Sequence, residues 1–403
     1  MNILYFASTD FYQKPNPSFH LMKAMIDDLL QDGHTIYYVG VAISNLDKHV
    51  PEDLMNNPKF ICSLVEMKSV QKNKFVRRYI EGARNAFKAK KFLRKYINDC
   101  DVIFLQSTPT VLYNTLVARR LAGNRKIVLN VQDMFPGSTI ASGVMKSRLQ
   151  QLLFAKMQRI AYRKADIVVG ISEDMKIKLI EQGVPESKIR VILNWFDDQT
   201  VSEVPRNQNR FIRKYDMRED KFYVQYAGTM GYVFDYHMVL EVASRLISNK
   251  DIIFHMIGEG SQKEAFVAEA NEKGLNNIQF LPLEPQNMVS DVYSACDVCF
   301  IPLKHGVIGN SVPSKAGLLM ACKRPIVTTV DRGCIYAKEI TESGLGFARS
   351  DDDPDSVAND ILYLYNNREI GKEMGKKGYE YGHIRYARSS NMHKYFNLFN
   401  ELM

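Results

Sequence analysis

The sequence lacks any apolar stretch long enough to cross a bilayer, and no basic leader precedes its first apolar run. It also lacks low-complexity tracts and short repeats of the solenoid or propeller kind. We therefore expect no membrane span, no signal peptide, no disordered chain and no repeat array. What is present is 403 residues, 46% hydrophobic and 24% charged, which is enough material for two domains.

Cysteine and histidine are sparse, and neither forms a complete metal-binding motif. The cysteines are scattered among mostly apolar residues, as expected for reduced thiols in a cytoplasmic protein, and they are Cys62, Cys100, Cys296, Cys299, Cys322 and Cys334. Cys296 and Cys299 have the spacing of a metal motif, but no second pair lies nearby, and a strand there would point them to opposite faces. We predict no metal site, and we interpret the eight histidines as structural.

Short apolar runs that suit buried strands recur along the chain, with helical segments between most of them. In the first half they are residues 3–7, 35–39, 102–105, 127–131, 167–171 and 191–193. In the second half they are residues 223–227, 252–257, 278–281, 298–303 and 326–329. The alternation predicts an α/β fold with two mostly parallel sheets, and the break in periodicity within 194–220 predicts the domain boundary.

Acidic residues are nearly absent from one segment. Residues 71–95 hold ten Lys or Arg and a single acid, Glu81, whereas the net charge of the whole chain is only +8. Phe75, Tyr79, Ala83 and Phe87 recur every four residues, which predicts an amphipathic helix. Such a helix can lie on an anionic membrane surface through its basic side chains, here Arg77, Arg78, Lys88, Lys90, Lys91, Arg94 and Lys95. The alternative is a solvated helix whose aromatic side chains face the core; nucleic acid is disfavoured because no binding motif accompanies the charge.

Three loops at the carboxyl ends of second-half strands are rich in small or polar residues. They read Gly228-Thr229-Met230-Gly231, Gly258-Glu259-Gly260 and Asn310-Ser311-Val312-Pro313-Ser314-Lys315. In the last loop, unpaired N–H groups of a helix start would combine with its serines and lysine into a cradle for phosphate. Each loop alone has a structural alternative, a tight turn or an ordinary helix start, so the joint pattern is the more specific signal.

The order of these motifs resembles the glycosyltransferases of family 4. The motifs that carry the resemblance are Gly33-His34, Val131-x-Asp133-x-Phe135-Pro136, Ala165-Asp166, Ser172-Glu173, Asn194-Trp195-x-Asp197, Ala227-Gly228-x-x-Gly231, Gly258-Glu259-Gly260, Ala295-x-Asp297 and Pro313-Ser314-Lys315. The serine-rich loop and the Asp133 motif look most similar to bacterial enzymes that transfer amino or deoxy sugars, such as N-acetylfucosamine, in O-antigen and capsule assembly.

The resemblance implies the GT-B fold: two Rossmann-like doubly wound α/β domains that face a cleft. We expect an acceptor domain at 1–197, a nucleotide-sugar domain at 198–384, and a helix at 385–403 that crosses back to the first domain. The implied reaction is transfer with retention from a nucleotide diphosphate sugar, expected to be UDP-linked, to a polyprenyl-diphosphate-linked saccharide, without metal or cofactor. The implied location is cytoplasmic, peripheral on the inner face of the cell membrane.

The resemblance also implies site residues. The catalytic positions are Asp133, Asn310 and Lys315, where Asp133 binds or deprotonates the acceptor hydroxyl or else caps the next turn structurally. Donor binding is assigned to Gly228, Thr229, Met230, Gly231, Gly258, Glu259, Gly260, Pro282, Leu283, Lys304, Ser311, Val312, Pro313, Ser314 and Leu318. Acceptor binding is assigned to Ser18, Gln106 and Ser107.

Two family glutamates, commonly eight positions apart, are replaced by Asn310 and Leu318. A leucine cannot accept ribose hydroxyls, so that contact must come from Glu259 or a backbone group. Lys304 and Lys315 remain as cations for the diphosphate. Two other classes therefore stay open: a nucleotide-sugar 2-epimerase or hydrolase on the same fold, and a non-catalytic nucleotide-sugar-binding partner of a membrane glycan assembly. The basic helix argues against the epimerase, because an enzyme that acts on a free sugar gains nothing by binding to a lipid surface.

Overall fold

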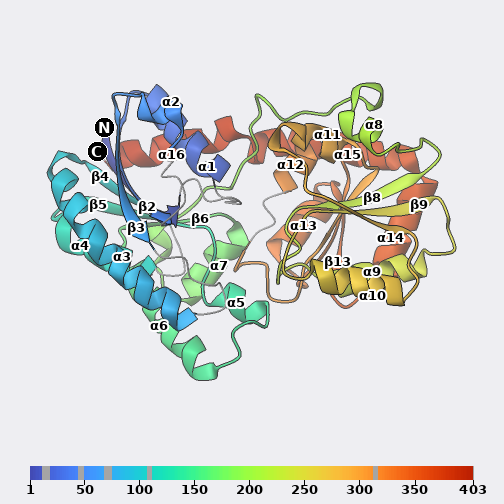
Figure 1. Cartoon of the computed structure of the whole chain (residues 1–403), viewed down its shortest axis with the longest axis horizontal. Coiled ribbons are helices and arrows are strands. Elements are labelled where there is room, and N and C mark those ends of the chain that lie inside the picture. The colour runs from blue at the N-terminus through green and yellow to red at the C-terminus, as the bar shows by residue number, and fades with distance from the viewer. Residues whose placement is uncertain (11–18, 44–49, 68–74, 107–110, 312–315, 403) are drawn as a thin grey trace.

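A computed structural model of the chain describes residues 1–10, 19–43, 50–67, 75–106, 111–311 and 316–402. It contains two parallel β-sheets, each with helices packed against it, and the two halves stand side by side in Figure 1. The predicted α/β class with two Rossmann-like domains is confirmed.

The first sheet has seven parallel strands in the order β3-β2-β1-β4-β5-β6-β7. They are β1 (Asn2–Asp10), β2 (Thr35–Ile43), β3 (Phe60–Met67), β4 (Val102–Gln106), β5 (Lys126–Val131), β6 (Ile167–Gly170) and β7 (Ile189–Val191). The helices are α1 (Phe19–Gln31), α2 (Glu52–Met55), α3 (Phe75–Tyr96), α4 (Val111–Ala122), α5 (Gly137–Ala141), α6 (Arg148–Lys164) and α7 (Glu173–Glu181). Alternate residues of β1 enter separate cores, Leu4 on one face and Ile3 on the other, so both faces of the sheet are buried.

The second sheet has six parallel strands in the order β10-β9-β8-β11-β12-β13. They are β8 (Phe222–Ala227), β9 (Ile252–Ile257), β10 (Ile278–Leu281), β11 (Val298–Pro302), β12 (Ile326–Val330) and β13 (Gly346–Ser350). The helices are α8 (Arg210–Lys214), α9 (Tyr236–Arg245), α10 (Lys263–Glu272), α11 (Val289–Ser294), α12 (Ala316–Ala321), α13 (Ile335–Glu342), α14 (Pro354–Asn366), α15 (Arg368–Arg385) and α16 (Arg388–Glu401).

The last helix, α16, packs on the first domain, as the resemblance implied. Tyr395 and Phe399 lie edge-on to Phe104 of β4, with ring centroids 6.0 and 6.1 Å apart. The Arg388 guanidinium pairs with Asp28 of α1 at 2.7 Å. Phe196 hydrogen-bonds through its backbone to residues 386 and 388, so the two segments that connect the domains run side by side. The exact boundaries at 197/198 and 384/385 stay predictions.

Two sheet-edge strands, β3 and β13, were not predicted. Both lie at a sheet edge and carry polar side chains, such as Glu66 in β3 and Arg349 in β13, so neither reads as a continuous apolar run. Gly346 lets β13 approach β12, because a Cβ at this position would overlap the carbonyl oxygen of Ile326.

The expected orientation of Cys296 and Cys299 is wrong. Cys296 precedes β11 and only Cys299 lies in the strand, so the alternation of strand side chains does not separate them. Their Sγ atoms lie 3.3 Å apart, and both residues are buried. Burial raises the pKa of the Cys299 thiol well above its ordinary value.

The predicted amphipathic helix is confirmed as α3, but its aromatic side chains do not share one environment. Tyr79 and Tyr96 are buried, whereas Phe87 is 65% exposed. Of the basic residues assigned to membrane contact, Arg78 and Lys90 are partly buried. The others are exposed: Arg77, Lys88, Lys91, Arg94 and Lys95. In the part of the chain that the structure describes, no helix has the length and apolarity needed to span a bilayer.

Candidate active site between the two domains

The two predicted glycine loops of the second domain lie directly against each other at the ends of β8 and β9. The backbone N–H of Met230 donates to the carbonyl of Glu259 at 2.9 Å. A Cβ at Gly258 would overlap the carbonyl oxygen of Gly228, and one at Gly260 would overlap that of Met230. These glycines are therefore required by packing, and they bring both loops to one edge of the sheet.

A Gly258→Ala substitution tests this packing. Gly258 has φ +136° and no room for a Cβ, whereas exposed Gly274 has φ +65° and no atom within 4 Å of the position of a Cβ. We expect Gly274→Ala to lower the free energy of unfolding by about 1–2 kcal/mol through backbone strain alone. Gly258→Ala should cost about 2 kcal/mol more because of overlap. Urea unfolding measures both variants, and equal losses would mean that the loops do not pack in this way.

Lys304, which follows β11, is held at the edge of the Gly228–Gly231 loop. Its Nζ lies 3.1 Å from Oε1 of Gln262, at the start of α10. The amide nitrogen of Gln262 in turn donates to the carbonyls of Gly231 and Phe234. Gln262 thus joins the lysine to the loop, and the ammonium is available to an anion placed over the loop. Sequence reasoning missed Gln262, since nothing in its local pattern marks it.

The other predicted donor-binding residues that the structure describes differ in how their side chains could contact a ligand. Glu259 pairs with Lys263 at 2.6 Å, and its side chain is 65% exposed, so the carboxylate can still accept a further hydrogen bond. Pro282 and Leu283 follow β10 and are exposed, Leu283 at 58%. Leu318 packs against the apolar core of the second domain, which agrees with its inability to bind a ribose hydroxyl.

On the first-domain side, polar side chains form a row across the carboxyl ends of the strands. Oε1 of Gln106 accepts hydrogen bonds from Tyr5 and Asn130, both at 3.2 Å. Asn130 accepts from Gln132 at 3.1 Å, and Gln132 accepts from Asn194 at 2.8 Å. Gln106 is only 5% exposed, so it supports this row from within the core. Its predicted contact with an acceptor stays a prediction.

The two domains meet at the loop that holds Asp133. The N–H of Met134 donates to the carbonyl of Asn310 at 2.8 Å, and the backbone of Gly137 leaves no space for a Cβ beside the Asn310 side chain. The side chain of Ser311 lies close enough to the Asp133 carboxyl group to lower its pKa. Three predicted site residues, Asp133, Asn310 and Ser311, are thus brought together where the two domains meet.

Asp133 keeps access to water, yet protein surrounds most of its carboxyl group. This desolvation raises the pKa of Asp133 above its ordinary value, and the interaction with the Ser311 side chain partly opposes the rise. A carboxylate with a raised pKa and an open side is suited to accept a proton from a hydroxyl group.

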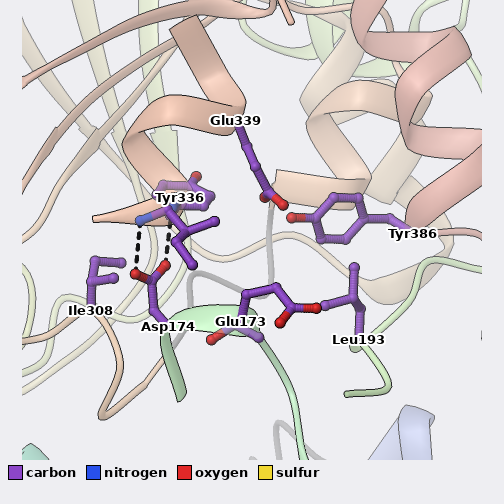
Figure 2. Close-up of a pocket in the computed structure, with 9 residues that line it drawn as sticks. Glu173, Asp174, Leu193, Ile308, Tyr336, Glu339 and Tyr386 are labelled. Atoms are coloured by element: carbon purple, nitrogen blue, oxygen red, sulfur yellow. Dashed lines mark hydrogen bonds between the residues drawn. The ribbon is translucent and has the colours of Figure 1, made fainter. Parts of the chain in front are cut away.

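A second contact region between the domains contains a small pocket with an acidic lining (Figure 2). Both carboxylate oxygens of Asp174 accept backbone N–H groups at the start of α13, from Ile335 at 2.8 Å and Tyr336 at 2.9 Å. Glu339 lines the same pocket and pairs with Arg385 at 2.9 Å; burial raises the pKa of Glu339. The lining carries carboxylates and includes none of the glycine loops, so this pocket is not suited to a diphosphate. The hydrogen bonds that Asp174 accepts from α13 hold the two domains together here.

Several predicted positions lie outside the described residues. They are Ser18, Ser107, Val312, Pro313, Ser314 and Lys315. The phosphate cradle and the catalytic lysine therefore stay predictions, as do the donor and acceptor roles of the described positions.

Two protein-family models match consecutive parts of the chain. The model described as Glycosyltransferase Family 4 matches residues 22–200, and the model described as Glycosyl transferases group 1 matches residues 207–381. The gap between them falls within the predicted boundary region, 194–220.

Similar proteins agree with the family models. The probable glycosyltransferase WbjE of Pseudomonas aeruginosa is 29% identical over 262 residues, 64% of this chain and 64% of WbjE. The putative colanic acid biosynthesis glycosyl transferase WcaI of Escherichia coli is 27% identical over 217 residues, 53% of each chain. The chain thus matches less than two thirds of the length of either relative.

Among solved structures, HepE of Anabaena in complex with UDP superposes with a TM-score of 0.73 at 14% identity, over 100% of both chains. At this identity the likeness concerns the fold alone. Together with the two family models, it establishes that this chain belongs to the glycosyltransferases, with a family 4 domain followed by a group 1 domain on the GT-B fold.

Proposed function

We propose that this chain transfers a sugar from a nucleotide diphosphate sugar to a lipid-linked saccharide during synthesis of a bacterial surface polysaccharide. The observation that carries the proposal is the backbone hydrogen bond at 2.8 Å from Met134, the residue after Asp133 in the first domain, to Asn310 of the second. It places an acidic side chain from the acceptor side at the loop that is predicted to hold the donor phosphates. WcaI, named for colanic acid biosynthesis, supports the pathway class, and WbjE supports the reaction class.

The donor is proposed to be UDP-linked and to lie over the stacked glycine loops. Close backbone packing at the glycines keeps the two loops together at one edge of the sheet, and Lys304 stands beside them. The UDP complex of HepE, which shares the fold, supports this choice of nucleotide. As the bond to the sugar breaks, charge grows on the diphosphate, and Lys304 with Lys315 would stabilise it in place of a metal.

The acceptor hydroxyl is proposed to approach Asp133 from the first-domain side. There the carboxylate would orient the hydroxyl and take up its proton, in a transfer that retains the configuration of the sugar. The proposed acceptor is a saccharide on a polyprenyl diphosphate, and the protein would bind peripherally to the cytoplasmic face of the cell membrane. The exposed basic stripe of α3 supports attraction to an anionic surface.

A non-catalytic role is the second candidate, because Asn310 and Leu318 replace two acids and Leu318 packs into the core. The first experiment is a thermal shift titration with UDP, GDP, ADP and TDP, with and without EDTA, which tests the donor site that both candidates require. We expect UDP to raise the Tm and EDTA to leave the rise unchanged. At a nucleotide concentration 100 times its Kd the stabilisation should be about 2.7 kcal/mol.

Turnover of a UDP-sugar with an acceptor extract completes this test. Binding of UDP without turnover would favour the non-catalytic candidate. Conversion of the UDP-sugar without any acceptor would favour a 2-epimerase or a hydrolase. A response to another nucleotide instead of UDP would change the proposed base of the donor. No response to any of the four nucleotides would contradict the proposed donor site.

A further inference from the structure

Three leucines at the start of α6 are exposed to an unusual degree. Leu149 is 77% exposed, Leu152 is 70% exposed and Leu153 is 53% exposed. Single exposed leucines are common on protein surfaces, but three within five residues of one helix form an apolar patch. No leucine of α6 is among the buried residues of this helix, so these side chains contribute little to the core.

The start of α3 lies beside this patch and extends it. Val76 is 53% exposed and Ile80 is 49% exposed. Between them, Tyr79 turns inward and stacks on Phe154 of α6, with ring centroids 4.4 Å apart. This contact joins the second turns of the two helices, and both helices lie along the same side of the first domain in Figure 1. We name Val76, Ile80, Leu149, Leu152 and Leu153 the apolar ridge.

The helices that carry the ridge are strongly basic. Helix α3 has eight Lys or Arg and one acid, Glu81, and α6 has five Lys or Arg and no acid. On α6 the basic residues Arg148 and Arg159 are exposed on the same helix as the leucines. Apolar side chains surrounded by basic ones match the headgroup region of an anionic bilayer, where the former enter the acyl boundary and the latter meet lipid phosphates.

The ridge is also connected to the candidate active site through one small aromatic cluster. Phe135 lies two residues after Asp133, and its ring centroid is 5.7 Å from that of Tyr79 and 5.4 Å from that of Phe154. The helices that carry the ridge thus pack directly on the loop that carries Asp133. A bilayer beneath the ridge would place lipid headgroups next to the acceptor side of the cleft.

We propose that the apolar ridge inserts into the headgroup layer of an anionic membrane, with the basic residues of α3 and α6 on the lipid phosphates. This inference rests on the proposed function, because a lipid-linked acceptor is what makes this orientation useful. It differs from attraction through α3 charges alone, since the leucines of α6 supply a contact that salt does not screen.

The first test is vesicle binding by the variant Leu149→Gln/Leu152→Gln/Leu153→Gln. Vesicles of phosphatidylcholine with phosphatidylglycerol, and of phosphatidylcholine alone, are sedimented with protein at low and high salt. We expect the triple variant to bind anionic vesicles at least about tenfold more weakly than the unmodified protein. The control is Ile384→Gln on α15, since Ile384 is 73% exposed in the second domain and should not contact lipid. Equal binding by the triple variant, or no binding by the unmodified protein, would overturn the proposal.

A second measurement reports insertion directly. Leu152→Trp adds a tryptophan to a chain that has a single one, Trp195, which is partly buried and packs against α16. With anionic vesicles that contain nitroxide-labelled lipid, the fluorescence of the Leu152→Trp variant should shift to the blue and be quenched, whereas that of Ile384→Trp should not change. If the introduced tryptophan of the Leu152→Trp variant stays unquenched on vesicle-bound protein, insertion is contradicted.

Two further readouts separate the possible failures. If the triple variant changes the oligomeric state by light scattering and leaves vesicle binding intact, the ridge is a contact between copies of this chain, and the membrane proposal is wrong. Transfer to a water-soluble saccharide lacking the polyprenyl chain tests the proposed function alone. The triple variant should keep this activity; if the unmodified protein lacks it but binds vesicles through the ridge, the proposed function fails and the membrane contact stands.

Discussion

Replacement of Asp133 by Asn is expected to lower kcat for sugar transfer by about 10²–10⁴-fold, because the amide cannot take up the proton of an acceptor hydroxyl. Asn has nearly the same shape as Asp and remains polar beside Ser311, so the fold and nucleotide binding should persist. Steady-state kinetics with saturating UDP-sugar measure the effect, and the UDP-induced shift in Tm serves as the check on the donor site.

The pH profile distinguishes a proton acceptor from a structural cap. Desolvation raises the pKa of Asp133, so its carboxylate is lost at a higher pH than that of an ordinary aspartate. Activity should therefore rise with pH as Asp133 loses its proton at its raised pKa. The residual activity of Asp133→Asn should not show this rise. A matched control is Asp216→Asn, since Asp216 is exposed and its left-handed backbone, φ 48°, is tolerated by Asn. If Asp133→Asn behaves like this control, Asp133 is a structural residue.

Replacement of Lys304 by Met is expected to lower kcat by about 10²–10³-fold, since the site loses a preorganised positive charge where the leaving diphosphate gains negative charge. The methionine keeps an unbranched apolar chain in the half-buried position. The same variant should weaken the binding of UDP more than that of UMP, because the second phosphate is the group that the ammonium would meet.

Isothermal titration with both nucleotides measures this difference. Lys250→Met is the control, because exposed Lys250 donates to the carbonyl of Ile247 at 3.2 Å and precedes β9, at the end of this strand opposite to the Gly258–Gly260 loop. Equal weakening of UDP and UMP by Lys304→Met would place the lysine on the nucleoside and not on the diphosphate. Unchanged kinetics would leave Lys315 as the remaining candidate cation.

Most of the strands that could be predicted are central and buried on both faces, although the edge strands β7 and β10 were predicted as well. Each central strand reads as an apolar run, for example β4 and β11, because parallel strands covered on both sides by helices tolerate few polar residues. The edge strands β3 and β13 have neighbours on one side only and carry polar side chains. Their pairing with β2 and β12 decides their conformation, so their own periodicity was too weak to reveal them.

The candidate site was predicted in part. Glycines after β8 and β9 were recognisable, although the reason for them, backbone contact between two loops, appears only in the structure. The polar row through Asn130 and Gln132 was missed, even though a polar residue near the end of an apolar strand could have signalled it. Gln262 and Asp174 were beyond prediction, because their partners lie on other elements, and for Asp174 on the other domain.

Sequence alone was sufficient for the repeated strand and helix pattern, the motif order and the local excess of positive charge, since all of these depend on residues close together in the chain. Folding was needed to bring Asp133 to Ser311, to attach Lys304 to the donor loop through Gln262, and to expose the leucines of α6 beside α3. Each of these depends on contacts between segments far apart in sequence, and such contacts arise from the packing of the two cores, which no local pattern encodes.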